Sequence, residues 1–225
     1  MMSRRRAILW PALGLLAIGL LSPAGVEAVT GEHNMGSKTP GRQVCVVCHT
    51  PHHAPSSPLL WNHVLSANSF SWSDWTETSG GTKLPTNIKT WSGSSKMCLS
   101  CHDGSVAIGA IYEPAETFDS TKITGKDQTA TSAGDLKGNH PVSVPYPYDG
   151  VKNTYNGIST GDLALTSGWV ARPTAVKLYT DKSVGGGSNR GIECASCHDP
   201  HGTSIKEYLR ASPLGSELCL KCHDK

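Results

Sequence analysis

Every cysteine of the chain belongs to one of four copies of a five-residue pattern, C-x-x-C-H, at residues 45–49, 98–102, 194–198 and 219–223. Two thiols at this spacing lie on neighbouring corners of one helical turn, where they can form thioether bonds to the two vinyl groups of one porphyrin. The histidine that follows can bind the porphyrin iron. The pattern therefore predicts four covalently attached haem c groups.

The predicted haem-binding residues follow directly from the four motifs. The expected thioether cysteines are Cys45, Cys48, Cys98, Cys101, Cys194, Cys197, Cys219 and Cys222. The expected proximal iron ligands are His49, His102, His198 and His223.

Three other uses of paired cysteines fit the sequence less well. A disulfide framework gives no reason for a histidine after each second cysteine. Structural zinc takes four ligands in all, so two C-x-x-C zinc sites would leave the motif histidines unused. A thioredoxin-like redox site needs a single C-x-x-C in a βαβ context. Four matches with no cysteine left over favour haem attachment over all three.

Six histidines lie outside the motifs, and an internal duplication singles out four of them. In each half of the chain one histidine precedes the first motif, and another follows that motif in a His-x-Pro-His unit. Two of the six, His53 and His63, have no counterpart in the other half, and we expect supporting roles for them. Counting ligands for four irons gives the expected distal ligands as His33, His52, His140 and His201.

The His-x-Pro-His units constrain which iron the second histidine can bind. Three residues span at most about 10 Å, and proline stiffens the path. The second histidine can therefore hardly travel around a porphyrin to the opposite face of the same iron. We expect His52 and His201 each to bind a haem other than the one attached beside it, which would hold neighbouring haems close together.

The N-terminus has the features of a secretory signal peptide. Three arginines at 4–6 precede an apolar run over residues 7–21, which is shorter than a membrane span of about 20 residues. Val26 and Ala28 occupy the small-residue positions of a cleavage site, with cleavage after Ala24 as the alternative. Export through the inner membrane follows. Removing residues 1–28 takes away three arginines and one glutamate, so the formal charge falls from +2 to 0, which argues against nucleic-acid binding.

The composition predicts a fold built around its cofactors. The chain has 24 glycines and 14 prolines among 225 residues, and only 37% of its residues are hydrophobic. Because this leaves little material for an ordinary core, we expect a haem-cored multihaem cytochrome c fold, mostly loop, with short helices and little strand. We expect a helical turn at each motif, a helix near 205–210 and a hairpin around 175–180.

The duplication also predicts the domain organisation. After a signal peptide at 1–28, residues 29–225 form one tetrahaem domain made of two two-haem modules, at about 29–118 and 139–225. A Ser/Thr/Gly-rich stretch over 119–138 is the expected junction, and three glycines at 185–187 mark a loop.

Longer runs around the motifs carry a family resemblance. These are CVVCHTPHHAP, PLLWNH, MCLSCHDGSVA, GNHPVSVPY, ECASCHDPHG, EYLR and LCLKCHDK. They resemble the multihaem outer-surface cytochromes of metal-reducing bacteria, among which are tetrahaem cytochromes that polymerise into extracellular nanowires. The resemblance implies bis-histidine haems in alternating parallel and perpendicular packing. It also implies a homopolymer in which an axial histidine of one subunit binds a haem of the next. The residue at that donor position is His52, and His53 beside it departs from the family pattern.

Electron transfer without substrate chemistry is the function that we expect. Two histidines on each iron leave no position for a substrate, so we expect no enzymatic activity. The expected partners are the protein itself, upstream periplasmic or outer-membrane cytochromes and external electron acceptors. A periplasmic monomeric shuttle shares every motif, and a multihaem reductase needs an iron with an open position. Only the resemblance favours the filament over the shuttle.

Overall fold

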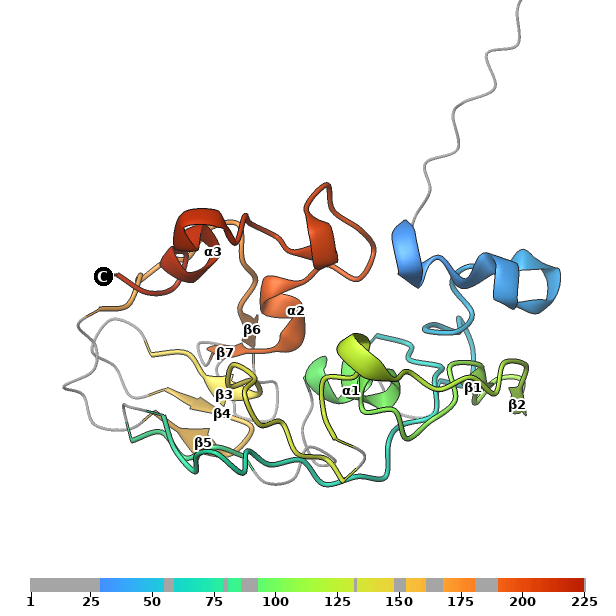
Figure 1. Ribbon diagram of the computed structural model, residues 1–225, viewed down its shortest axis with the longest axis horizontal. Coiled ribbons are helices and arrows are strands. Elements are labelled where there is room, and N and C mark those ends of the chain that lie inside the picture. Colours follow the sequence, from blue (N-terminus) through green and yellow to red (C-terminus); the bar gives the residue numbers. More distant parts are fainter. Residues whose placement is uncertain are drawn as a thin grey trace, which may run out of the picture.

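The computed structural model describes residues 29–54, 59–78, 81–85, 93–131, 133–147, 153–160, 168–180 and 190–224. The predicted signal peptide and the glycine loop at 185–187 lie outside these residues. The regular elements are short, and irregular chain connects them (Figure 1). The described α-helices are α1 (Ser95–His102), α2 (Cys194–Cys197) and α3 (Glu217–Leu220).

The strands form small antiparallel sheets. β1 pairs with β2, β4 pairs with β5, and a three-stranded sheet has the order β3-β7-β6. The strand bounds are β1 Ala110–Ile111, β2 Glu116–Thr117, β3 Val144–Pro145, β4 Thr154–Tyr155, β5 Ile158–Ser159, β6 Tyr179–Thr180 and β7 Arg190–Ile192. Within the described part of the chain, the helices and strands are few and short, in agreement with the predicted fold of short helices and little strand. A core formed by haem remains a prediction.

Each C-x-x-C-H motif forms a helical turn, as the spacing predicts. The first motif is a single turn, in which the backbone N–H of His49 donates to the carbonyl of Cys45 at 2.8 Å. The other three motifs end α1, form α2 and overlap α3. At the start of α2 the backbone N–H of Glu193 donates to the Ser196 hydroxyl at 2.9 Å, and the Ser196 N–H donates to the Glu193 carbonyl at 2.8 Å. These bonds satisfy N–H groups that a one-turn helix would otherwise leave unpaired.

Two predicted elements differ in detail from the structure. Residues Lys206–Tyr208 form a 3₁₀ turn rather than an α-helix, because Glu207 adopts a left-handed backbone with φ of 60° that an α-helix does not accept. The predicted hairpin at 175–180 differs as well: the strand β6 at its end pairs with β7, which lies further along the chain. The remaining 3₁₀ helices are Gly31–His33, Met35–Lys38, Pro40–Arg42, Gly125–Asp127 and Leu214–Ser216.

A small apolar core lies between α1 and the three-stranded sheet. It contains nine buried side chains from both halves of the chain: Phe70, Trp72, Leu84, Leu99, Ala130, Leu136, Val144, Tyr146 and Ile192. Leu99 belongs to the second motif, and Ile192 lies two residues before the first cysteine of the third. The core thus fixes these two motifs relative to one another.

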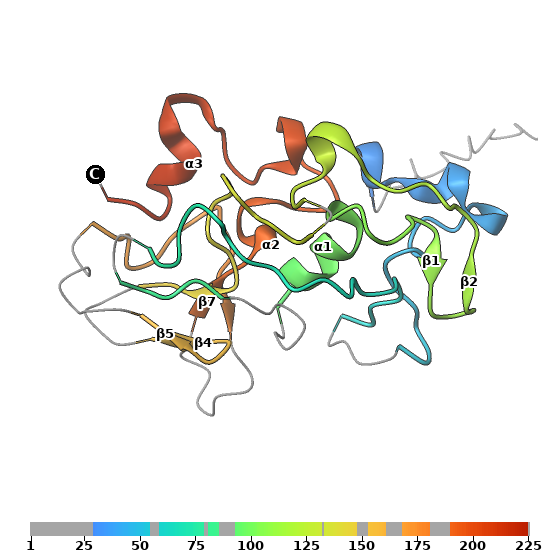
Figure 2. The ribbon, with the colours of Figure 1, turned by 60° about the horizontal axis from the view of Figure 1, so that its bottom comes forward.

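The motifs succeed one another along the long axis of the molecule. α3 lies near one end, α2 and α1 lie side by side in the middle, and residues 29–54 lie toward the other end (Figures 1 and 2). The N-terminal segment packs on the loop after the third motif, where Thr30 N–H donates to the carbonyl of His201 at 3.1 Å and the Tyr208 hydroxyl donates to the carbonyl of Thr30 at 3.2 Å. The two halves are therefore interleaved. No helix in the described ranges is long and apolar enough to cross a membrane.

Candidate haem sites

The eight motif cysteines carry free thiols in the structure. All eight lie in described residues, and none forms a disulfide. Burial raises the pKa of Cys48 to about 11 and that of Cys101 to about 12. An uncharged sulfur is favoured at such positions. A thioether is an uncharged sulfur, so these sites suit covalent haem attachment.

Most of the predicted iron ligands hold their imidazole ring by the same contact. The ring atom Nδ1 lies 2.7–3.0 Å from a backbone carbonyl oxygen, which fixes the ring and leaves Nε2 free to bind a metal. The pairs are His33 with Pro200, His49 with Leu59, His102 with Asp127, His140 with Pro141, and His198 with Glu207. Burial lowers the pKa of His33, which favours the neutral imidazole that metals bind.

Six of the eight predicted ligands come together as three pairs. The ring centroids of His33 and His102 are 6.1 Å apart. Those of His49 and His201 are 6.2 Å apart, and those of His140 and His223 are 6.4 Å apart.

This separation is what two imidazoles on opposite faces of one metal ion require. A metal–nitrogen bond to histidine is about 2 Å long, so the two ring centroids lie roughly 6 Å apart. In the described ranges no three His, Cys, Asp or Glu side chains converge on a metal-ion site.

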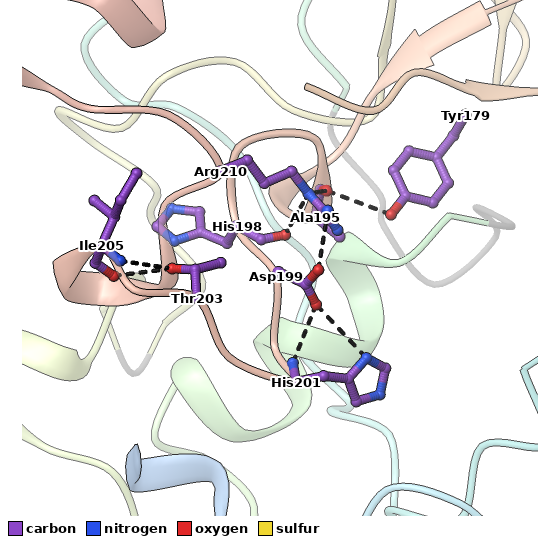
Figure 3. Close-up of polar contacts among 8 residues, drawn as sticks. All are labelled: Tyr179, Ala195, His198, Asp199, His201, Thr203, Ile205 and Arg210. Atoms are coloured by element: carbon purple, nitrogen blue, oxygen red, sulfur yellow. Dashed lines mark hydrogen bonds and ion pairs between the residues drawn. The ribbon is translucent and has the colours of Figure 1, made fainter. Parts of the chain in front are cut away.

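The third motif is braced by an ion pair that also faces His201. The Arg210 guanidinium lies 3.0 Å from Asp199 Oδ2, and its Nε donates to the carbonyls of Ala195 and His198 (Figure 3). The other carboxylate oxygen of Asp199 lies 3.6 Å from Nδ1 of His201. Figure 3 shows the rings of His198 and His201 pointing away from each other, so they do not face a common iron.

The third motif differs from the other three in the pairing of its histidine. Among the described residues, no imidazole ring is paired with His198 in the way that the other three motif histidines are paired. His52 is exposed, and its backbone N–H and carbonyl both bond to the Thr50 hydroxyl. His53 beside it is also exposed and has a positive φ of 57°. One expected iron position and one expected ligand therefore remain unmatched.

Aromatic side chains pack on three of the paired histidines. Tyr208 stacks on His33 with ring centroids 4.7 Å apart, and Trp169 lies 4.5 Å from His223. Neither of these two contacts was predicted, because a single sequence carries no signal for contacts between positions so far apart. Trp61 lies edge-on to His49 at 6.1 Å.

The indole N–H of Trp61 is a donor without an acceptor. It is buried and has no hydrogen-bond partner among the described residues. An unpaired buried donor is costly, and a bound group with carboxylates, as haem has, would supply an acceptor. Together with the paired imidazoles and the uncharged sulfurs, this donor makes the site fit haem c.

His63 occupies a different environment from the predicted ligands. Its side chain is fully buried at 0% exposure, with Nδ1 at 2.8 Å from the carbonyl of Val64 and Nε2 at 3.0 Å from that of Ala107. Nε2 also lies 3.3 Å from the Cys101 sulfur. Because both ring nitrogens already face acceptors, neither is directed to an open site.

Replacing His63 should therefore affect stability but not iron ligation. We expect His63→Ala to lower the free energy of unfolding by about 2–4 kcal/mol, since it leaves a cavity and unpaired carbonyls. The visible and electron paramagnetic resonance spectra of the folded variant should match those of the wild-type protein. A new high-spin iron signal in folded His63→Ala would show that this histidine is a ligand.

A comparison with protein families covers part of the chain. Residues 187–225, which carry the third and fourth motifs, match the protein family described as "Doubled CXXCH motif", Paired_CXXCH_1. This match is consistent with a multihaem c-type cytochrome. The paired motifs indicate covalently bound haem c and a role in electron transfer. No curated protein matches the chain.

Proposed function

We propose that the protein conducts electrons through four bis-histidine haem c groups and performs no substrate chemistry. Three imidazole pairs at 6.1–6.4 Å are the observation that carries this proposal. Bound haem iron supplies one-electron redox chemistry at each site. Each of the three pairs would hold one haem iron from both faces, and the carbonyl oxygens beside Nδ1 would keep most of these rings in position.

The pairing follows the internal duplication. His33 of the first half pairs with His102 at the second motif of that half, and His140 of the second half pairs with His223 in the equivalent place. These two pairs lie each within one half of the chain.

The second histidine of the His-x-Pro-His unit at 198–201 follows a different rule, because it pairs with a histidine of the other half. His201 of the second half pairs with His49, at the first motif of the preceding half. By the same rule, His52 binds at the first motif of the half that precedes its own. We propose that this half belongs to another subunit, in which His198 is the motif histidine that lacks an imidazole partner among the described residues.

A polymer follows from this rule. We propose that His52 of each subunit completes the haem attached at Cys194 and Cys197 of its neighbour, so that the subunits form a filament with a continuous series of haems. This would be an extracellular nanowire of the OmcE type, exported to the outer surface. It would receive electrons from upstream periplasmic or outer-membrane cytochromes and pass them to external acceptors.

A multihaem reductase is the second candidate, and one observation favours it. Because His198 has no imidazole partner among the described residues, its iron could keep an open position for a substrate. A monomeric shuttle would show the same open position unless His52 reached the iron within one chain. The two rivals therefore differ from the filament in the coordination of this one haem.

Ligand-binding spectroscopy tests the proposal. The native protein should contain four low-spin, six-coordinate irons, and carbon monoxide should not bind its reduced form readily, because both axial positions are taken. Electron paramagnetic resonance and carbon monoxide difference spectra measure this directly. One stoichiometric high-spin iron that binds carbon monoxide or nitrite in the assembled protein would favour the reductase.

A further inference from the structure

A buried carboxylate lies where the two halves of the molecule meet. Glu193 is 1% exposed and sits between α1, which carries the second motif, and α2, which carries the third. These helices lie side by side in both views of the molecule (Figures 1 and 2). Haem ligation does not account for Glu193, because it is neither a ligand nor an attachment residue.

Three donors from separate segments hold the carboxylate. Glu193 Oε2 accepts hydrogen bonds from the backbone N–H of Ser95 at 2.9 Å and from the hydroxyl of Ser143 at 3.0 Å. Its Oε1 accepts one from the hydroxyl of Tyr155 at 2.8 Å. A Cβ added at Gly93 would lie 1.7 Å from Oε1, so glycine at this position leaves the space that the carboxylate fills.

The same contact ties the two attachment helices together. Cys194 N–H donates to the hydroxyl of Ser95, the first residue of α1, at 3.0 Å. Ser95 therefore bonds both to Glu193 and to the residue after it. Through these contacts the helix that carries Cys98 is held against the helix that begins at Cys194.

The hydrogen bonds suit a charged carboxylate. All three partners are donors, and an ionised carboxylate accepts only, so every contact is satisfied in that form. Burial raises the pKa of Glu193, and the bonds from Ser95, Tyr155 and Ser143 oppose this shift. A negative charge in the interior acts more strongly on nearby groups than a solvated one, because the local dielectric constant is low.

We propose that Glu193 is a positioning residue for the electron step between the second and third haems, and that its negative charge makes both haems harder to reduce. The step in question is the one that links the two halves of the chain. This inference rests on the proposed electron-transfer function. The hydrogen bonds set the relative position of the two attachment helices, and the charge opposes the addition of an electron on either side.

The substitution Glu193→Gln tests the charge with little change in shape. In the full-length haem-loaded protein, we expect two of the four reduction midpoint potentials to rise by about 59 mV each. This rise corresponds to a tenfold change in the equilibrium constant of a one-electron reduction. The matched control is Glu217→Gln, which removes an exposed carboxylate two residues before Cys219. Solvent and salt screen that charge, so the four reduction midpoints of the Glu217→Gln protein should match those of the wild-type protein.

A second measurement needs no change at Glu193. Reduction of the wild-type protein should shift the infrared band of one buried carboxylate. The variant Tyr155→Phe should move that band, because it removes a hydrogen bond, while leaving the reduction midpoints near the wild-type values because the charge stays. Unchanged midpoints in folded Glu193→Gln, or no carboxylate response in the wild-type protein, would overturn the inference. Failure of the wild-type haems to titrate reversibly would instead contradict the proposed function.

Discussion

His52→Ala protein should carry four attached haems, contain one partly high-spin iron and fail to form filaments. The haems stay attached because the substitution touches no cysteine. His52 is exposed, so the loss of its ring should cost the isolated fold less than about 0.5 kcal/mol. The iron bound by His198 should lose its sixth ligand, since no other described imidazole is paired with it. Electron paramagnetic resonance and size-exclusion chromatography measure the two effects.

The neighbouring residue supplies a matched control. His53→Ala removes an equally exposed imidazole one position along the chain and should leave spin state and assembly unchanged. Filaments of normal length and spectrum from His52→Ala would refute the intersubunit bond. Loss of filaments only in His53→Ala would assign the donor role to His53.

Cys101→Ser should disrupt the mature fold more than any substitution of a distal histidine. It removes one of two thioethers from the second haem, whose helix α1 lies in the middle of the molecule beside α2 (Figure 1). A domain has a net stability of only about 5–15 kcal/mol, and a chain with few hydrophobic residues depends strongly on the apolar contacts of its haems. We expect poor haem retention and rapid proteolysis of the secreted protein.

The fourth motif offers the comparison for this effect. Cys219 is exposed and lies near the end of the chain, so Cys219→Ser should lower the thermal midpoint by a smaller amount than Cys101→Ser. Haem content by mass spectrometry and protease resistance of the secreted protein are the measurements. Normal secretion and protease resistance of Cys101→Ser protein lacking its haem would show that the polypeptide core suffices.

Local chemistry was predictable from the sequence, and contacts between distant segments were not. The turns at the motifs follow from C-x-x-C-H, because its requirements lie within five residues. The contact of His33 with Pro200 joins residues 167 positions apart, and nothing in either sequence neighbourhood indicates it. The duplication nevertheless identified which histidines would be candidates for pairing. It did not predict that His201 would pair with His49 of the other half.

The supporting residues were the least predictable part of the site. In the sequence Glu193 is an ordinary charged residue before a cysteine. In the structure it is buried, and its carboxylate accepts hydrogen bonds from Ser95, Ser143 and Tyr155. His63 looked like a spare imidazole, and the structure shows a buried one that faces two carbonyls. Both placements depend on tertiary packing that no single segment encodes.

High-resolution electron microscopy of the secreted, haem-loaded protein would show the ligation between subunits. We expect filaments in which the His52 side chain of one subunit and His198 of the next bind opposite faces of the same iron. The other three irons should lie between the histidine pairs of a single chain. Monomers in which the iron at His198 has an open face, or filaments in which that iron takes both ligands from one chain, would contradict it.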